Sequence, residues 1–371
     1  MTREPIRVAQ VIGKLNAAGV EAVVNNYYRN IDRTKYQFDY YIEADGACQP
    51  PQELIDLGAR YFVIPPCQRL PQYIRALVKR FRENSYPIVH SGMNTLAVFS
   101  LFAAWAAGSP VRINHNHSTA NRGETKRNLL KYALRPFAKL FATHYCACSR
   151  YAGQWLFGKR SVEAGKVAVF NNAIDTERFR FDPQAREATR RELGLENTLV
   201  LGHVGRFCYQ KNQEFLIELL AEVRKSRPEA VLVLIGIGKT EEAIRRMADE
   251  LELREAVLFL SARPDVERLY QAMDVFVFPS RYEGLGLAAV EAQCAGLPVL
   301  ASDNVPREAQ VTDRIRFLRL EDGVSAWAGA INDLPAADRV CRIDDRFDIR
   351  REAKKLEEFY DAALAQAGRR G

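Results

Sequence analysis

The sequence has no long apolar run and no recognisable secretion signal. Its longest uncharged apolar stretch is the twelve residues from Leu96 to Ala107, which is short of the roughly 20 needed to span a bilayer. Residues 1–7 contain charges where a signal peptide has an apolar core. The seven cysteines are odd in number and scattered, which favours reduced thiols over a disulfide framework. We therefore expect a cytoplasmic protein.

The composition is that of a globular protein, and its charge is unevenly distributed. With 371 residues, 47% hydrophobic and 27% charged, the chain is long enough for two domains. The net charge of +7 is concentrated in the first half. There, two basic runs lie on expected helices near 69–82 and 126–141; they are Arg75, Lys79, Arg80 and Arg82, and Arg127, Lys131, Arg135 and Lys139. Such runs are usually solvated helix faces, and a membrane surface is the alternative. No nucleic-acid-binding motif accompanies them.

Short β-branched runs alternate with amphipathic stretches along the whole chain. The strands expected are 6–12, 38–42, 60–64, 88–90, 111–114, 144–148 and 167–170, followed by 199–204, 230–235, 256–260, 275–278, 299–301 and 315–318. Apolar strands separated by helices indicate parallel sheets covered on both faces. The sequence thus predicts an α/β protein with two doubly wound domains, 1–175 and 176–349, and a C-terminal helix in 350–371.

The most informative segment lies between Glu283 and Glu291. An apolar run ends at Pro279, a Gly-rich turn follows, and a helix opens near Leu287. Backbone N–H groups and the helix dipole favour an anion at such a turn, while carboxylates accept hydrogen bonds from hydroxyls. Helix capping is the simpler explanation of two glutamates. A ligand with both hydroxyls and phosphates, such as a nucleotide sugar, is the functional one.

Other loops that follow strands carry candidate ligand-binding groups. Gly13 and Gly19 bracket the turn after the first strand, and Gly205, Arg206 and Lys211 follow the first strand of the second half. An arginine and a lysine converging there suit a diphosphate. Gly236 begins a loop that resembles the end of a P-loop, but Val233 stands where that motif requires glycine. We therefore reject an NTPase and keep only a backbone approach to a ligand.

The histidines after strands in the first half are the remaining candidates. His115 and His117 lie two residues apart, and His90 follows its own strand. We expect one of the first pair to face the ligand crevice. His144, Cys146 and Cys148 alternate along a strand, but no second cluster of ligands accompanies them, so we predict no metal.

Together these motifs resemble the retaining GT-B-fold glycosyltransferases of family 4, in particular those making bacterial capsular, exopolysaccharide or O-antigen sugars. The resemblance covers nearly the whole chain and rests most specifically on Glu283 and Glu291, with seven residues between them. Departures are Ala18 where the family often has glycine, Ala173 after Asn172, and Leu285 where phenylalanine is commonest. None of them removes a functional side chain.

The resemblance implies a role for each site residue. Arg206 and Lys211 would bind the donor diphosphate, Glu283 the donor sugar, and Glu291 the ribose. His117, or else His115, would contact the sugar or acceptor, with His90 as a further acceptor candidate. The catalytic set is thus Glu283, His117, Arg206 and Lys211; the donor set is Gly19, Gly205, Arg206, Lys211, Gly236, Ser261, Arg263, Glu283, Gly284, Leu285, Gly286, Leu287 and Glu291.

The resemblance also implies the reaction and the partners. We expect a metal-independent glycosyltransferase without a cofactor, moving a sugar from a UDP-sugar to a glycan or polyprenyl-diphosphate-linked acceptor in a cleft between the domains. The basic helices would then hold the protein at the inner face of the cell membrane, and the C-terminal helix would pack on the N-terminal domain. The alternatives are a non-catalytic nucleotide-sugar or glycan-binding protein and a sugar-nucleotide epimerase of the same fold. A dehydrogenase lacks its G-x-G-x-x-G motif in this chain.

Overall fold

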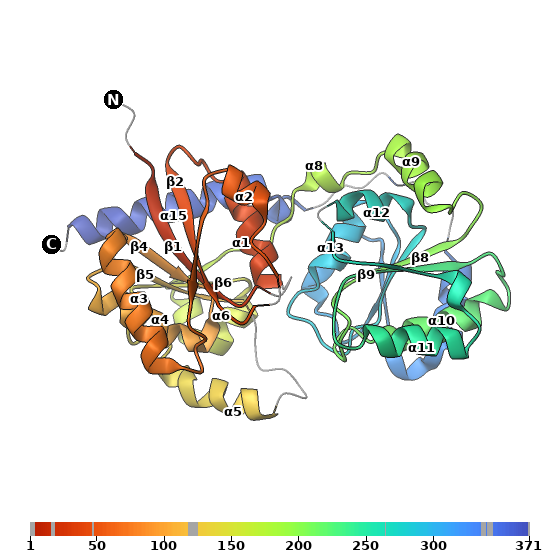
Figure 1. Ribbon diagram of the computed structural model, residues 1–371, viewed down its shortest axis with the longest axis horizontal. Helices are drawn as coiled ribbons and strands as arrows, with labels where there is room; N and C mark the ends of the chain where they lie inside the picture. The colour runs from red at the N-terminus through yellow and green to blue at the C-terminus, as the bar shows by residue number, and fades with distance from the viewer. Residues whose placement is uncertain are drawn as a thin grey trace. The chain divides into compact units, whose positions relative to one another are not determined.

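The structure, a computed structural model, divides the chain into two compact units (Figure 1). It describes residues 4–15, 19–46, 48–117, 125–263, 265–334, 339 and 344–369, with backbone alone for 125–128. The N-terminal unit comprises residues 1–173 and 348–371, and the C-terminal unit comprises residues 174–347. These divisions fall two residues before the expected boundaries at 175 and 349.

A seven-stranded parallel sheet forms the centre of the N-terminal unit. Its order is β3-β2-β1-β4-β5-β6-β7, with bounds β1 Ile6–Gly13, β2 Tyr36–Glu43, β3 Arg60–Ile64, β4 Ile88–Ser91, β5 Val111–Asn116, β6 His144–Ala147 and β7 Val167–Val169. The chain reverses its direction of travel across the sheet between β1 and β4, which pair in parallel from Val8↔Ile88 to Val11↔Ser91. In open sheets, such a switch point is where ligands bind.

Helices cover both faces of this sheet. They are α1 Gly19–Asn30, α2 Gln52–Asp56, α3 Leu70–Asn84, α4 Ala97–Ala106, α5 Thr125–Leu134, α6 Arg150–Phe157, α7 Lys159–Glu163 and α15 Ile349–Gly368, with 3-10 turns η1 Asn94–Leu96 and η2 Arg135–Phe137. Between α3, α4 and the sheet lies an aromatic core that includes Tyr41, Tyr73 and Phe81. Apolar side chains on one stripe of each helix account for this packing.

The C-terminal helix α15 packs on the N-terminal unit, as predicted. It buries Ile349, Ala353, Leu356, Tyr360 and Ala363, a spacing that puts all five on one face. Figure 1 shows α15, in blue, beside the red strands β1 and β2. Residues that are far apart in the sequence meet here, since the rings of Tyr36 and Tyr360 lie 5.2 Å apart.

One predicted helix is shorter than expected. The basic helix near 126–141 ends at Leu134, and residues 135–137 form the 3-10 turn η2. Pro136 explains the break, because proline has no N–H to donate and its ring clashes with the preceding turn. The basic side chains after the break contact the protein itself: Arg135 lies over the Trp155 ring at 5.6 Å, and Lys139 donates to Ser161 at 2.7 Å. The stripe of four basic residues is therefore not continuous.

The C-terminal unit contains a six-stranded parallel sheet in the order β10-β9-β8-β11-β12-β13. The strands are β8 Val200–Val204, β9 Val231–Ile235, β10 Val257–Leu260, β11 Val275–Phe278, β12 Val299–Ser302 and β13 Ile315–Leu318. The helices are α8 Thr176–Phe179, α9 Pro183–Leu193, α10 Gln213–Arg224, α11 Glu241–Glu250, α12 Val266–Ala272, α13 Leu287–Cys294 and α14 Gly323–Asn332; the 3-10 turns are η3 Arg254–Ala256, η4 Arg307–Ala309, η5 Leu320–Asp322 and η6 Asp345–Phe347. Its switch point lies between β8 and β11.

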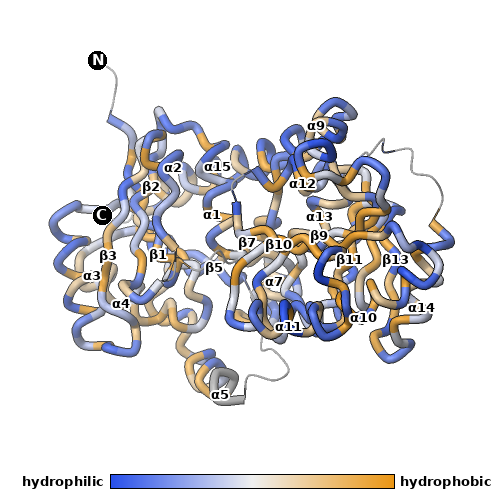
Figure 2. Tube along the Cα trace, turned by 45° about the vertical axis from the view of Figure 1, so that its right-hand side comes forward, coloured by the Kyte–Doolittle hydropathy of each residue, from blue (hydrophilic) through white to orange (hydrophobic). Residues whose placement is uncertain are grey.

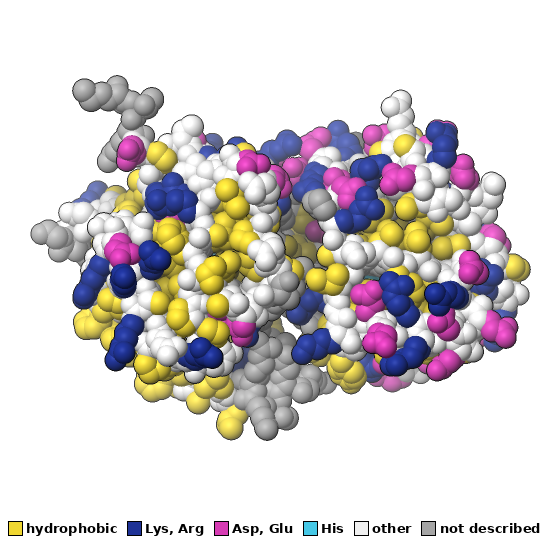
Figure 3. All heavy atoms as spheres, viewed as in Figure 1, with side chains coloured by type: hydrophobic (Ala, Val, Ile, Leu, Met, Phe, Trp, Pro, Cys, Tyr) yellow, Lys and Arg dark blue, Asp and Glu magenta, His cyan; other side chains and the backbone are white. Residues whose placement is uncertain are grey.

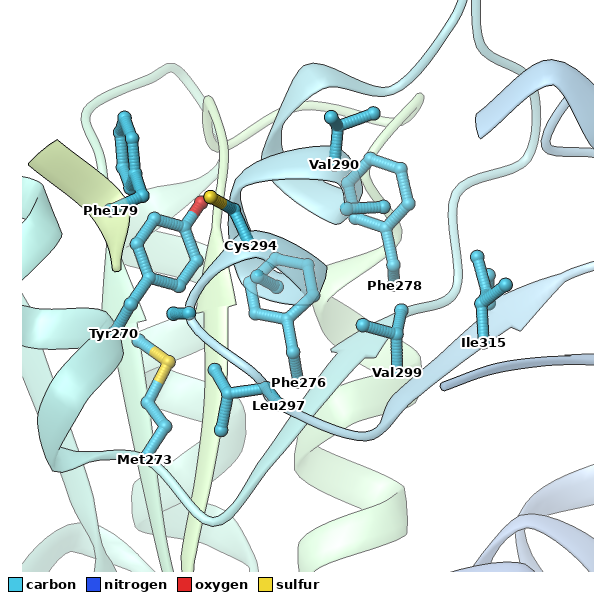
Figure 4. Packing of buried hydrophobic residues seen from close by; sticks show 14 of the residues in the cluster. Phe179, Tyr270, Met273, Phe276, Phe278, Val290, Cys294, Leu297, Val299 and Ile315 are labelled. Carbon is cyan, nitrogen blue, oxygen red and sulfur yellow. The ribbon is translucent and has the colours of Figure 1, made fainter. Parts of the chain in front are cut away.

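The core of the C-terminal unit fixes the position of α13. Phe276 and Phe278 extend from β11 toward the Val290 and Cys294 side of that helix (Figure 4). Figure 2 shows strands such as β9, β11 and β13 as strongly hydrophobic, whereas α11 is hydrophilic along much of its length. All thirteen strands predicted from the sequence are present, each within two residues of its expected ends. The loops at their carboxyl ends are therefore the right place to look for a site.

Candidate functional site

Two loops meet at the switch point of the C-terminal unit. One follows β8 and ends at Asn212, the residue before α10, and the other runs from Pro279 after β11 to Gly286 before α13. Asn212 donates to the carbonyl of Pro279 at 3.2 Å and accepts from Arg281 at 2.7 Å. These bonds explain why Asn212, with φ of 58°, keeps a left-handed conformation that asparagine tolerates better than most residues. The two loops are thus held as one surface.

An ion pair between Lys211 and Glu283 lies at the centre of this surface. The Lys211 Nζ is 2.7 Å from the Glu283 Oε1 and 4.6 Å from the centre of the Phe278 ring. Only 16% of the lysine side chain and 7% of the glutamate side chain are exposed. Both residues were predicted from the sequence, Lys211 to bind the donor diphosphate and Glu283 to bind the donor sugar. The structure brings them together, so each orients the other when no ligand is present.

Glu291, the second acid of the motif, is the fifth of the eight residues of α13 and is held by Tyr270. The Tyr270 hydroxyl donates to the Glu291 Oε2 at 2.8 Å. Burial raises the pKa of Glu291 above its ordinary value, and the Tyr270 hydrogen bond opposes that rise. One carboxylate oxygen is thereby fixed by tyrosine, while the carboxylate as a whole keeps acceptor capacity for a further hydroxyl.

The turn before α13 requires glycine at one position. Gly286 has φ of 91°, and a Cβ there would lie 2.9 Å from the Phe278 ring. Gly284 is exposed, while Leu285 and Leu287 are half-buried and pack against the core of the unit. Because the first turn of a helix leaves backbone N–H groups without intrahelical partners, this turn presents donors beside the two glutamates.

Gly205 and Gly236 allow two loops to pack against each other. A Cβ on Gly236 would lie 2.1 Å from the Gly205 carbonyl oxygen, and Gly205 N–H donates to Ile235 at 2.9 Å. Close approach of the two backbones is therefore sufficient to explain Gly236 without a ligand. Arg206 follows this contact and is exposed. Among the residues that the structure describes, none accepts a hydrogen bond from its guanidinium.

The remaining predicted donor residues differ in whether their side chains already form hydrogen bonds within the protein. Ser261 is exposed after β10. Arg263 forms two hydrogen bonds with Asp265, each 2.6 Å long, and this pairing raises the pKa of Arg263. Gly19 begins α1, and a Cβ there would meet nothing within 4 Å. The fold of the chain itself therefore does not require glycine at position 19.

Three histidines form a buried cluster in the N-terminal unit. His90 comes from β4, and His115 and His117 come from the end of β5. The His115 and His117 rings stack with centres 4.0 Å apart, and the His90 and His115 rings lie 5.2 Å apart. All three are at most 7% exposed. Residues 115 and 117 share a face because strand side chains alternate, and β4 lies beside β5.

Burial keeps these three side chains uncharged. It lowers the pKa of His90 to about 3 and that of His117 to about 4, and it lowers the pKa of His115 well below its ordinary value. Both ring nitrogens of His90 are used, by Tyr360 at 2.7 Å and by His115 at 3.0 Å. A ligand would have to replace one of these two hydrogen bonds, and the contact of His90 with an acceptor stays a prediction.

Several residues of these sites were not predicted from the sequence. They are Tyr270 beside Glu291, Tyr360 and Gln10 beside His90, and His203, whose Nδ1 lies 2.9 Å from the carbonyl oxygen of Val277. Burial lowers the pKa of His203 to about 3. A histidine just before Gly205 at the end of β8 was the one signal available in the sequence. Nothing in the sequence indicated that Tyr270 or Tyr360 would lie at these sites.

Two further findings limit the chemistry within the described ranges. No helix there is both long enough and apolar enough to cross a membrane. In the same part of the chain, no three His, Cys, Asp or Glu side chains are grouped as metal ligands would be. His144, Cys146 and Cys148 therefore do not assemble into a metal site with other described residues.

Solved structures resemble the chain over nearly its whole length. The crystal structure of Anabaena Alr3699/HepE in complex with UDP and glucose matches with a TM-score of 0.77 at 21% identity, covering 96% of this chain and 100% of that one. The lipopolysaccharide-biosynthesis glycosyltransferase WaaG matches with a TM-score of 0.63 at 16% identity, covering 98% and 93%. Two doubly wound domains with a C-terminal helix on the first define the GT-B fold.

Sequence comparison then gives the family. Residues 17–178 match the model of glycosyltransferase family 4, and residues 185–354 match that of glycosyl transferases group 1. EpsF of Bacillus subtilis (strain 168), named as a glycosyltransferase, is 34% identical over 369 residues, which cover 98% of this chain and 92% of EpsF. The chain belongs to family 4 and is a glycosyltransferase that takes its sugar from a nucleotide sugar.

A further relative has a substrate in its name. The UDP-Gal:alpha-D-GlcNAc-diphosphoundecaprenol alpha-1,3-galactosyltransferase of Escherichia coli is 25% identical over 381 residues, covering 97% of each chain. Its donor and its lipid-linked acceptor are properties of that protein.

Proposed function

We propose that this glycosyltransferase retains the anomeric configuration and moves a sugar from UDP to a polyprenyl-diphosphate-linked or glycan acceptor in cell-surface polysaccharide synthesis. The names of the relatives support this: EpsF, the galactosyltransferase acting on a diphosphoundecaprenol sugar, and HepE with bound UDP. The observation that carries the donor assignment is the Lys211–Glu283 pair beside Glu291 at the switch point.

The chemistry of these residues fits the parts of a nucleotide sugar. The exposed guanidinium of Arg206 and the Nζ of Lys211 would neutralise the diphosphate, and the N–H groups at the start of α13 would bind its oxygens. Glu283 would accept from hydroxyls of the sugar and Glu291 from those of the ribose. Backbone around Ser261 would contact the base. These charges would stabilise the leaving nucleotide without a metal ion.

The pairing of Lys211 with Glu283 adds a step to donor binding. When a diphosphate approaches Lys211, the ammonium has three protons to donate, so it can hold a phosphate oxygen and Glu283 together. Lys211 then links Glu283, the proposed sugar-binding acid, to the phosphate. This arrangement would hold the sugar and the diphosphate of the donor in one orientation, and such positioning lowers the barrier to group transfer.

In the N-terminal unit, we propose that His117 contacts the transferred sugar or the acceptor, with His115 behind it. The two rings stack with their centres 4.0 Å apart, so His115 can support the His117 ring. The reaction would then be a front-face displacement, in which the departing phosphate oxygen takes the acceptor proton. The donor residues and the identity of the nucleotide share one test.

That test is nucleotide release from UDP-, GDP- and ADP-sugars, with and without a lipid-linked acceptor extract. We expect UDP release that depends on acceptor, persists in a chelator, and is abolished by Glu283→Gln and Lys211→Met. Glu250→Gln, an exposed carboxylate on α11, is the matched control and should stay active. Release from another nucleotide would correct the base. Neither release nor thermal stabilisation by any nucleotide would overturn the donor-site assignment.

We further propose that the N-terminal unit docks on anionic membrane lipid, through the two segments predicted from the sequence. The first is the segment near 126–141, and the chain that follows it is also basic: residues 129–166 contain Lys131, Arg135, Lys139, Arg150, Lys159, Arg160 and Lys166 and the single acid Glu163. Exposed apolar side chains are interspersed with them: Leu129, Leu130, Tyr132, Phe137, Leu140 and Tyr151, with Trp105 at the end of α4. Figure 3 shows basic side chains set among apolar ones on one face of this unit.

The second segment, α3, contributes charge rather than apolar surface. Arg75 and Lys79 are exposed, while Arg80 pairs with Glu83 at 3.2 Å and Arg82 donates to the carbonyl of Ala106 at 2.9 Å. Basic residues near an anionic surface contribute about 1 kcal/mol each, and apolar side chains that enter the interface add to this. We therefore assign the larger share of binding to the segment 129–140.

A further inference from the structure

A chain of buried hydrogen bonds joins the C-terminal helix to the histidine cluster. Gln10 on β1 donates its side-chain N–H to the Tyr360 hydroxyl at 3.1 Å. The Tyr360 oxygen lies 2.7 Å from the His90 Nδ1, and the His90 Nε2 lies 3.0 Å from the His115 Nδ1. All four side chains are at most 5% exposed, so water does not compete for these groups.

The direction of the protons along this chain follows from the donor at its start. A neutral imidazole has one N–H and one acceptor nitrogen, and burial keeps these rings neutral. Because the amide of Gln10 donates to Tyr360, the phenol proton points to the His90 Nδ1. His90 then carries its proton on Nε2 and donates it to the His115 Nδ1. His115 must therefore carry its own proton on Nε2.

The end of the chain faces a small cavity. His115 Nε2 is buried and has no hydrogen-bond partner among the described residues. The cavity has a volume of about 20 Å³ and is lined by Gln10, Tyr27, His90, Gly92, His115 and His117 together with apolar side chains. That volume is enough for one water molecule. A polar site of this size suits an oxygen atom that accepts a hydrogen bond.

We infer that Tyr360 is a positioning residue, which through His90 sets the tautomer of His115 so that its Nε2–H is presented to a hydrogen-bond-accepting oxygen beside His117. In the resting protein that oxygen belongs to a water molecule. This inference rests on the proposed function, in which His117 contacts the sugar or acceptor. His115 stacks on His117, so the relay would hold that ring and its water in one arrangement before substrate binds.

The first test is nuclear magnetic resonance of the full-length protein labelled with 15N-histidine, since long-range 1H–15N correlations distinguish the two neutral tautomers. The chain has only five histidines, and His→Gln substitutions assign them. At pH 7.5 we expect both His90 and His115 as Nε2–H tautomers. Finding either of them as the Nδ1–H tautomer would overturn the inference, because the relay would then run in the opposite direction.

The second test separates the relay from a general loosening of α15. Tyr360→Phe removes the proton donated to His90, so we expect His90 and His115 both to become tautomer mixtures. Tyr36→Phe is the matched control. Tyr36 packs against Tyr360 and donates to Asp361 on the same helix at 2.8 Å, but it has no part in the relay. Equal tautomer changes in both variants, or none in Tyr360→Phe, would refute a positioning role.

A kinetic measurement connects the relay to turnover. With the donor identified by nucleotide release, Tyr360→Phe should lower kcat several-fold and leave KM for the donor unchanged, while Tyr36→Phe should retain kcat. A wild-type kcat in Tyr360→Phe would leave the tautomers without a role in transfer and so refute the inference. If no sugar donor is turned over at all, the proposed function fails, while the tautomer measurement still decides the relay.

Discussion

At the scale of single residues, the proposed donor site is built from pairs rather than from isolated groups. Lys211 is held by Glu283, and Glu291 is held by Tyr270. The exposed Arg206 is the exception. A pair keeps each charged group oriented before a ligand arrives, so less conformational freedom is lost on binding. Arg206, in contrast, is available to respond to the ligand.

Removing the Tyr270 hydroxyl should weaken nucleotide binding and make it depend on pH. A hydrogen bond to a charged group contributes about 1.5–3 kcal/mol, so Tyr270→Phe should raise the Kd for UDP at least about tenfold. The same change should raise the pKa of Glu291 further, since this hydrogen bond opposes the effect of burial. Titration calorimetry at pH 8 and pH 6 measures both effects, with weaker binding at pH 6.

Tyr209→Phe serves as the control for that experiment. Tyr209 is 66% exposed and lies under Arg281 at 4.4 Å, in the loop after β8. Removal of the Tyr209 hydroxyl should leave the Kd for UDP unchanged. If Tyr270→Phe binds UDP as the wild type does at both values of pH, then Glu291 is not a ribose ligand held by Tyr270.

At the scale of elements, the turn before α13 depends on one backbone conformation. Gly286→Ala places a Cβ at φ of 91° and 2.9 Å from the Phe278 ring, and should destabilise the C-terminal unit by about 1–3 kcal/mol. Gly329→Ala, in the middle of α14 with nothing within 4 Å of the added Cβ, should instead stabilise it by about 0.5–1 kcal/mol. Denaturant unfolding measures both variants. Equal effects would show that neither steric contact nor φ decides the outcome.

The segment after Pro136 can be tested as a membrane contact. Phe137→Ser with Leu140→Ser removes two side chains that are 51% and 63% exposed, each contributing up to roughly 1.5–3 kcal/mol if buried in lipid. We expect at least about tenfold weaker sedimentation with phosphatidylglycerol vesicles, and little binding of either protein to phosphatidylcholine. Leu251→Ser, 44% exposed in the C-terminal unit, is the control. Unchanged sedimentation of the double variant would place the contact elsewhere.

The elements themselves could be predicted because most strands contain a short run of apolar, β-branched or aromatic residues, and several in the C-terminal unit are apolar throughout. The run of Val231 to Ile235, for example, has no polar residue to suggest another structure. The end of α5 was missed although Pro136 was visible, because the apolar pattern continues through it. The histidine relay was out of reach, since Tyr360 and Gln10 are separated by 350 residues. No local pattern indicates that α15 carries a tyrosine to β4.

At the scale of the whole molecule, the buried histidines make stability depend on pH. Burial lowers the pKa of His90, His115 and His117 in the N-terminal unit and of His203 in the C-terminal unit. The unfolded chain binds protons below about pH 6.5, whereas the folded chain does not until about pH 4 or below. The buried histidines therefore do not lower the free energy of unfolding above about pH 6.5, and they lower it progressively as the pH falls below that value.

The loss should be steeper for the N-terminal unit, because it contains three of these histidines. Each contributes at most about 1.4 kcal/mol per pH unit below its unfolded pKa, so three contribute up to roughly 4 kcal/mol per pH unit. Thermal unfolding between pH 7.5 and pH 5 should show the N-terminal transition shifting more than the C-terminal one. A Trp327→Phe variant leaves fluorescence from the N-terminal unit alone. Parallel shifts of both transitions would contradict this account.

The discontinuous N-terminal unit has a consequence for synthesis in the cell. Its last helix, α15, is translated only after residues 174–347, which takes roughly 10–35 s at typical rates of elongation. During that time β1 and α1 lack the helix that covers them, while the C-terminal unit is already complete in sequence. The N-terminal unit, whose synthesis begins first, is therefore the last to be completed. A premature stop codon just before α15 would release a chain with a complete C-terminal unit and an N-terminal unit that lacks its last helix.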